Sequence, residues 1–130
     1  MPITKYSDFT KILTTFKCDG DLSFREIVGS MKDFYGGIDN PPTKKLIWNL
    51  RNATIWSLTM EELKAIAQLS VENEGLMKGG KTAVVAPKDI DFGLARIYQA
   101  HTVGSERELM VFRTLDEAKE WMDLESNETL

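Results

Sequence analysis

The chain has 130 residues, of which 42% are hydrophobic and 28% charged, with a formal net charge of −4 at pH 7 and a sequence pI near 5.0. This composition is typical of a single globular domain and excludes a disordered, fibrous or disulfide-scaffold protein. Binding of nucleic acid through its phosphates requires clustered lysine and arginine, so the scattered basic residues and the acidic balance exclude that class of partner as well.

The sequence contains no sign of a membrane or export segment. The first residues lack the apolar core of a secretory signal, and no apolar run approaches about 18 residues in length. Cys18 is the single cysteine, and its place in a strand-like pattern favours a buried side chain over a reactive thiol. We therefore expect a cytoplasmic protein with no membrane insertion.

The first predicted elements are a hairpin and a helix. Residues alternate with period 2 from Thr10 to Cys18, which predicts a strand, and the residues before it predict a short partner strand with Ser7-Asp8 as the turn. Ser23 with Glu26 forms a capping box before an amphipathic helix. Gly36-Gly37 predicts the end of that helix.

A buried strand and a capped helix follow. The apolar run from Leu46 to Leu50 predicts the strand, an eight-residue loop comes next, and a helix opens at Thr59 with Glu62 in capping-box position. Open α/β sheets most often carry functional groups at the carboxyl ends of their central strands, where this loop lies. Trp56 is in the loop, and its ring either covers the core or belongs to a contact surface.

The rest of the chain continues to alternate strands and helices. The run from Thr82 to Ala86 predicts an interior strand, and the segment from Ile90 to His101 predicts a helix with Ile90 on its apolar stripe. A last strand is predicted from Leu109 to Phe112. Thr114 then opens a closing helix whose buried side includes Trp121.

This order of elements predicts one α/β domain over residues 1–130, with its core at about 10–124 and a frayed tail at 125–130. Strands that alternate with amphipathic helices predict a mixed sheet with parallel central strands and right-handed crossovers. The N-terminal hairpin would lie at an edge of the sheet, and about four helices would cover it.

Two motifs suggest chemistry that their context does not support. Residues 75–82, GLMKGGKT, match the phosphate-loop pattern, but that loop must leave a strand and open a helix, whereas here a helix precedes and a strand follows. We expect no nucleotide binding. Residues 91–96, DFGLAR, copy the metal-binding segment of protein kinases without the other kinase motifs, and Asp91 or Asp89 is interpreted as a helix cap.

His101 is the single histidine, so a histidine metal cluster or a site that uses two histidines cannot form. Its place at a helix end favours a structural role. We expect a protein that is not an enzyme and that uses neither a cofactor nor a metal.

The segments LIWNL, RNATIWS, TMEEL, KTAVVA, FGLARIY and VFRTLDEAKEWM, in this order, resemble the STAS superfamily over about residues 10–124. The chain is most similar to small stand-alone bacterial members such as the anti-sigma-factor antagonists. In those proteins the central strand ends in an aspartate, and the second serine of an Asp-Ser-Ser segment at the next helix is the phosphorylated switch. The corresponding residues here are Asn49 at the strand aspartate, then Ser57, Leu58 and, at the switch serine, Thr59.

The resemblance implies a regulatory domain that acts through protein-protein contacts, and a homodimer is one assembly that would fit. The candidate phospho-switch or contact surface comprises Thr59, Ser57, Asn49 and Trp56. Only Thr59 keeps the chemistry of the family's residue, and its alternative role is that of a helix N-cap, worth about 1 kcal/mol of stability.

The alternative function is a binding module for a small apolar or lipid-like ligand. An apolar pocket lined by Met60, Met31 or Trp56 would favour this alternative, because ligand sites are mostly concave and apolar. An exposed apolar patch around residues 57–62 would instead favour a protein partner.

Overall fold

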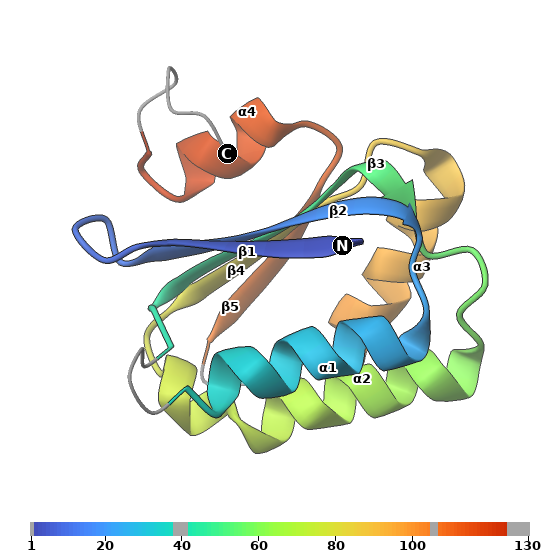
Figure 1. The fold of residues 1–130 in the computed structure, drawn as a ribbon, viewed down its shortest axis with the longest axis horizontal. Helices are drawn as coiled ribbons and strands as arrows, with labels where there is room; N and C mark the ends of the chain where they lie inside the picture. The colour runs from blue at the N-terminus through green and yellow to red at the C-terminus, as the bar shows by residue number, and fades with distance from the viewer. Residues whose placement is uncertain (1, 38–41, 105–106, 125–130) are drawn as a thin grey trace.

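The computed structural model describes residues 2–37, 42–104 and 107–124, and the predicted frayed tail at 125–130 lies outside them. In these residues one five-stranded sheet is surrounded by four α-helices and a short 3-10 helix (Figure 1). The strands are β1 (Ile3–Asp8), β2 (Leu13–Asp21), β3 (Lys45–Thr54), β4 (Lys81–Val85) and β5 (Glu108–Phe112). The helices are α1 (Phe24–Tyr35), α2 (Met60–Glu72), η1 (Glu74–Met77), α3 (Asp89–Ala100) and α4 (Leu115–Trp121).

The sheet has the strand order β1-β2-β3-β4-β5, which is also the order along the chain. β1 pairs antiparallel with β2, and the other three neighbouring pairs are parallel. The prediction of a mixed α/β sheet with parallel central strands and an antiparallel hairpin at its edge is therefore confirmed.

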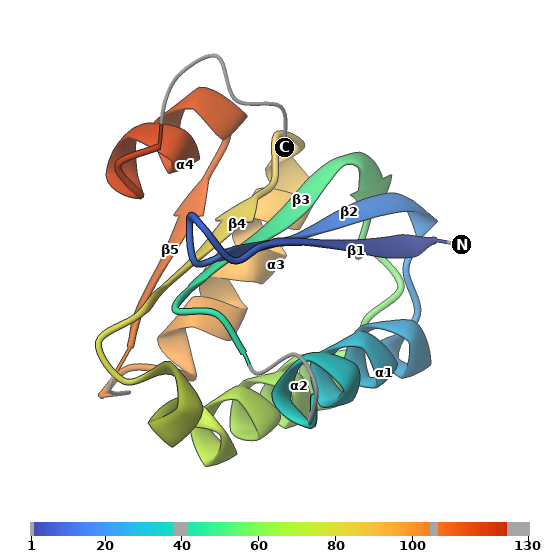
Figure 2. The same cartoon turned by 60° about the vertical axis from the view of Figure 1, so that its left-hand side comes forward.

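The handedness of the crossovers explains how the helices are distributed. α1, α2 and α3 each connect two adjacent parallel strands, and the chain always advances toward the same edge, so right-handed crossovers put all three helices on one face. α4 follows the last strand and is free of this constraint. Figures 1 and 2 show it on the opposite face of the sheet.

Two hydrophobic cores follow from this arrangement. The larger core lies between the sheet and α1, α2 and α3, and it includes Phe16, Leu46 and Leu63. The smaller core lies under α4 and includes Ile47 and Met122. The central strands are thus covered on both faces, which accounts for their continuous apolar runs.

The hairpin differs in detail from the prediction. β2 begins at Leu13 rather than Thr10, and the turn spans residues 9–12 instead of Ser7-Asp8. Ile12 adopts a φ of 50° and is exposed, so it belongs to the turn and not to the alternating strand. A β-branched residue with positive φ is strained, which is why the sequence pattern did not indicate a turn there.

The segment GLMKGGKT is a helix end and a turn that enters β4. Gly79 has a φ of +76°, and a Cβ at Gly80 would collide with the backbone oxygens of Lys44 and Met77. The N–H groups of Gly80 and Lys81 already donate to carbonyl oxygens, at 2.7 and 2.8 Å. A phosphate loop needs such N–H groups free, so this segment lacks the geometry for holding phosphates.

The helix α3 presents a different face to the core than expected. Ile90, which was predicted to be on the buried stripe, is 60% exposed, whereas the side chain of Asp91 is fully buried. The prediction was wrong at this position because the carboxylate of Asp91, and not the side chain of Ile90, points into the protein. The reason lies in a contact with the loop that follows β3.

Candidate functional site

The loop between β3 and α2, residues 55–59, is the candidate site, and it is shorter than predicted. β3 continues to Thr54 because it stays paired with β2, where Gly20 and Asp21 face Ala53 and Thr54. Ile55 and Leu58 turn into the core and are 6% and 8% exposed. A hydrogen bond of 3.1 Å from the N–H of Leu58 to the carbonyl oxygen of Ile55 closes the turn.

A buried carboxylate from α3 holds the start of this loop. Oδ1 of Asp91 accepts hydrogen bonds from the backbone N–H of Ile55 at 2.9 Å and from the hydroxyl of Thr54 at 3.1 Å. The same hydroxyl accepts from the N–H of Trp56 at 3.1 Å. Asp91 is therefore a loop anchor, and its interpretation as a helix cap was wrong, since the N-cap position of α3 is Lys88.

A second acidic residue holds the middle of the loop. The hydroxyl of Ser57 donates to Oδ1 of Asp21 at 3.1 Å and lies 3.4 Å from the carbonyl oxygen of Leu22. Ser57 itself is exposed. Asp21 ends β2, so the loop after β3 is bound to its neighbouring strand as well as to α3. The sequence predicted neither anchor, because nothing local marks a carboxylate that acts on a distant loop.

Thr59 closes the loop as the N-cap of α2. Its hydroxyl oxygen accepts from the N–H of Glu62 at 3.1 Å, and Oε1 of Glu62 accepts from the N–H of Thr59 at 2.9 Å. The capping box predicted from the sequence is therefore confirmed. Thr59 is exposed at a helix start where N–H groups and the helix dipole favour an anion, so a phosphate could be accommodated there.

Trp56 and Met60 flank this cap and face solvent, with 57% and 49% of their surface exposed. Of the two roles that the sequence left open for Trp56, the structure thus favours a contact surface over a lid on the core. We define the loop-tip surface as Trp56, Ser57, Thr59 and Met60. It lies on a loop that Asp91 holds through the backbone N–H of Ile55 and that Asp21 holds through the hydroxyl of Ser57.

Asn49 is not brought to the loop-tip surface. It is 5% exposed and lines a polar pit of about 150 Å³ together with Lys17, Cys18, Asp19, Arg51 and Asn52. Its Oδ1 accepts from the N–H of Arg51 at 3.1 Å. The predicted group of site residues is therefore divided between the loop tip and this pit.

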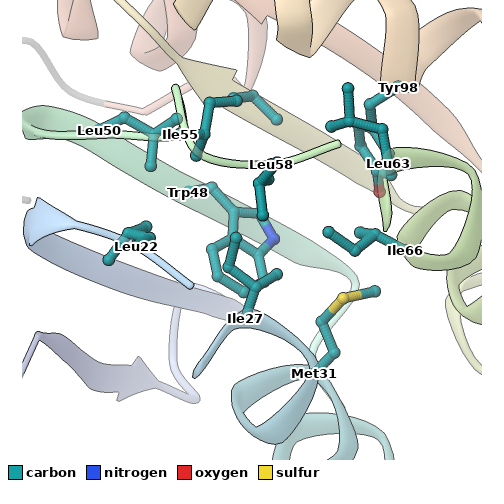
Figure 3. Close-up of a pocket in the computed structure, with 11 residues that line it drawn as sticks. Leu22, Ile27, Met31, Trp48, Leu50, Ile55, Leu58, Leu63, Ile66 and Tyr98 are labelled. Carbon is teal, nitrogen blue, oxygen red and sulfur yellow. The ribbon is translucent and has the colours of Figure 1, made fainter. Parts of the chain in front are cut away.

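An apolar cavity lies under the loop, between the sheet and the helices α1 and α2. Figure 3 shows Ile27 and Met31 of α1 and Leu58 of the loop directed toward Trp48 of β3. The cavity has a volume of about 60 Å³. Met31 lines it, as the ligand alternative required, whereas Trp56 and Met60 do not. Ligand pockets usually measure about 300–1,000 Å³, so this cavity is much smaller than a typical binding site.

The remaining candidate for a catalytic or metal-binding role, His101, has a structural position. His101 is the exposed C-cap residue of α3, and its N–H donates to backbone oxygens in the last turn. Across residues 2–37, 42–104 and 107–124, no three histidine, cysteine, aspartate or glutamate side chains gather closely enough to hold a metal ion. In the same part of the chain, every helix is too short or too polar to cross a membrane.

Comparisons of this chain with protein-family models, with curated proteins and with solved structures found no match.

Proposed function

We propose that this chain is a STAS-like regulatory domain of the cytoplasm, which acts without catalysis through contacts between its loop-tip surface and a protein partner. The observation that carries the proposal is the exposure of Trp56 and Met60 on an anchored loop. Aromatic and methionine side chains are enriched in protein interfaces, and tryptophan often dominates their binding energy. A loop that is ordered before binding loses less conformational entropy when a partner docks.

The position of Thr59 supports regulation of this contact by phosphorylation. A phosphate on its hydroxyl would add a charge of about −1.5 to −2 at neutral pH. That charge would lie beside Glu61 and Glu62, which open α2. An acidic or apolar partner would then be repelled from the loop-tip surface, while the helix start would tolerate the phosphate.

The alternative function, binding of a small apolar or lipid-like ligand, rests on the apolar cavity. All the residues that line it are apolar or aromatic, but its volume is about 60 Å³. A drug-sized or lipid-like molecule would need several times this space. The contact function therefore has the stronger support, because its surface exists without rearrangement.

Site-specific photo-crosslinking in the native host tests the contact function. A photoreactive residue at Trp56 or Met60 should capture a defined protein, which the same residue at Val103, 85% exposed and outside the loop-tip surface, should not capture. With that partner purified, Trp56→Ala should weaken binding by at least about 2 kcal/mol, as expected for an interface hot spot. Equal capture from Val103, or equal affinity of the Trp56→Ala variant, would contradict the proposal.

Native mass spectrometry of the protein purified from the same host distinguishes the ligand-binding function from the protein-contact function. A copurified small molecule that is lost when the cavity is filled by Val84→Phe would support the ligand function. A mass equal to that of the chain alone, or to twice that mass for a dimer, would mean that no small molecule is bound and would leave the protein-contact function as the better explanation.

A further inference from the structure

The pit around Asn49 is shaped by an irregularity in the pairing of β2 and β3. Lys17 pairs with Asn49, but the next pair is Asp19 with Asn52, so two steps along β2 correspond to three along β3. Neighbouring residues of a regular strand point to opposite faces, and a bulge interrupts this alternation. Leu50 and Ala53 are in the larger core, while both Arg51 and Asn52 line the pit.

The bulge also fixes the orientation of the Asn49 amide. The N–H of Arg51 donates to Oδ1 of Asn49 at 3.1 Å. Since an N–H group requires an acceptor, the amide oxygen must face Arg51, and the NH₂ group of Asn49 must face the other way. Within the described residues this NH₂ group has no protein hydrogen-bond partner, although Asn49 is only 5% exposed. This NH₂ group is not among the fully buried atoms that lack a partner, so it is open to the pit and takes its acceptor from solvent or from a ligand there.

Two cationic side chains surround the same pit. Lys17 lines the pit, and its ammonium lies over the ring of Tyr6 on β1, 5.0 Å from the centroid, so it would turn toward β3 to meet an anion beside Asn49. In the described part of the chain, neither Lys17 nor Arg51 forms an ion pair with a carboxylate. Asp19 is the single carboxylate that lines the pit, so these three side chains contribute a net charge of +1.

From this geometry we infer that the pit binds a small oxyanion, a phosphate or a carboxylate, held by the Asn49 amide, the Lys17 ammonium and the Arg51 guanidinium. Its volume of about 150 Å³ corresponds to roughly five water molecules at about 30 Å³ each, which is enough for one such group. Charge-assisted hydrogen bonds to an oxyanion are the strongest that these donors can form. Asp19 opposes the anion and limits its affinity. This site is separate from the loop-tip surface.

An NMR titration of the isotope-labelled protein tests this inference. Sodium phosphate, sodium acetate and sodium chloride are added separately at equal ionic strength and neutral pH. Phosphate or acetate should produce saturable shifts in the side-chain amide of Asn49 and in the backbone amides of residues 17–19 and 49–52. The anion with the lower Kd identifies whether the natural ligand carries a phosphate or a carboxylate. Shifts that do not saturate, or that chloride reproduces, would overturn the inference.

Substitutions at the pit give a second readout. Arg51→Gln and Lys17→Gln should each raise the Kd about tenfold, whereas Asp19→Asn should lower it. Lys64→Gln is the matched control, because Lys64 is an exposed cation of α2 and does not line the pit. An unchanged Kd in the folded Arg51→Gln and Lys17→Gln variants would show that the anion binds elsewhere and would refute the site.

Discussion

The carboxylate of Asp91 accepts a hydrogen bond from the backbone N–H of Ile55 at 2.9 Å, across 36 positions of sequence. Through this contact the first turn of α3 fixes the loop that presents Trp56. The other carboxylate oxygen, Oδ2, is buried and has no hydrogen-bond partner in the described residues. A side chain that replaces Asp91 must therefore still provide an acceptor for the N–H of Ile55.

Asp91→Ala should therefore cost about 1–3 kcal/mol, because the N–H of Ile55 loses its buried acceptor. Asp91→Asn should cost less, since an amide oxygen can take the place of Oδ1. Asp89→Ala is the control: Asp89 forms an exposed ion pair of 2.7 Å with Arg113, and such pairs contribute about 0–1 kcal/mol. Urea unfolding measures all three. If Asp91→Ala were as stable as Asp89→Ala, Asp91 would not anchor the loop.

Thr59 and Ser23 form equivalent capping boxes. Ser23 can therefore serve as a control that separates the role of Thr59 as a helix cap from its proposed role as a phosphorylation switch. Ser23 accepts from the N–H of Glu26 at 3.1 Å, as Thr59 does from Glu62. Replacement by Ala should cost about 1 kcal/mol at either position, while Asp, which also caps, should leave stability nearly unchanged.

The two capping positions should differ in partner binding if Thr59 is a phosphorylation switch. Thr59→Asp would then lose a crosslinked partner that Thr59→Ala and Ser23→Asp retain. Recovery of the same partner by all of these variants would end the switch hypothesis and leave Thr59 as a cap.

Glycine substitutions should change stability in opposite directions at two positions. A Cβ at Gly80 would collide with backbone oxygens of Lys44 and Met77, which cannot move as a flexible side chain would, so Gly80→Ala should cost at least about 1–3 kcal/mol. A Cβ at Gly29 in α1 would meet open space, so Gly29→Ala should stabilise the chain by about 0.5–1 kcal/mol. Thermal unfolding compares them: a Gly80→Ala variant at least as stable as the parent would contradict the packing around Gly80, and a destabilised Gly29→Ala variant would contradict the open space at Gly29.

Two tryptophans provide a matched pair for packing. Trp121 is partly buried against the smaller core, with its ring centroid 5.6 Å from that of Phe112, so it is less enclosed than predicted. Trp121→Ala should cost about 2–3 kcal/mol, below the 3–5 expected for a fully buried ring. Trp56→Ala, at an exposed position, should change stability by no more than about 0.5 kcal/mol. Equal unfolding midpoints for the two variants would mean that α4 is not docked.

The thiol of Cys18 should be unreactive in the folded chain. Burial, with a smaller contribution from the charge of Asp19, raises its pKa from 9.0 to about 12. The folded chain then holds the proton more tightly than the unfolded chain, so this contribution to stability is fully present below pH 9 and is lost as the pH rises toward about 12. A disulfide exchange reagent at pH 8 should react only after urea unfolding. Rapid reaction of the native protein would contradict the burial of this side chain.

Local signals in the sequence were sufficient for most of the fold. A capping box depends on residues three positions apart, so Ser23 with Glu26 and Thr59 with Glu62 predicted two helix starts correctly. The alternation of apolar strands and amphipathic helices predicted the parallel sheet, because only a crossover helix can join adjacent parallel strands over such lengths.

The functional geometry was decided by contacts between distant segments. Asp91 and Asp21 became loop anchors because α3 begins and β2 ends beside residues 55–59, and no local pattern records that proximity. Asn49 was separated from Thr59 because its neighbours Trp48 and Leu50 face the larger core, so that Asn49 points to the opposite face of the sheet, where the bulge adds Asn52 to the pit. Sequence patterns report the periodicity of one element at a time. These sites depend instead on how two elements are aligned with each other, and that alignment is set only when the sheet and helices pack.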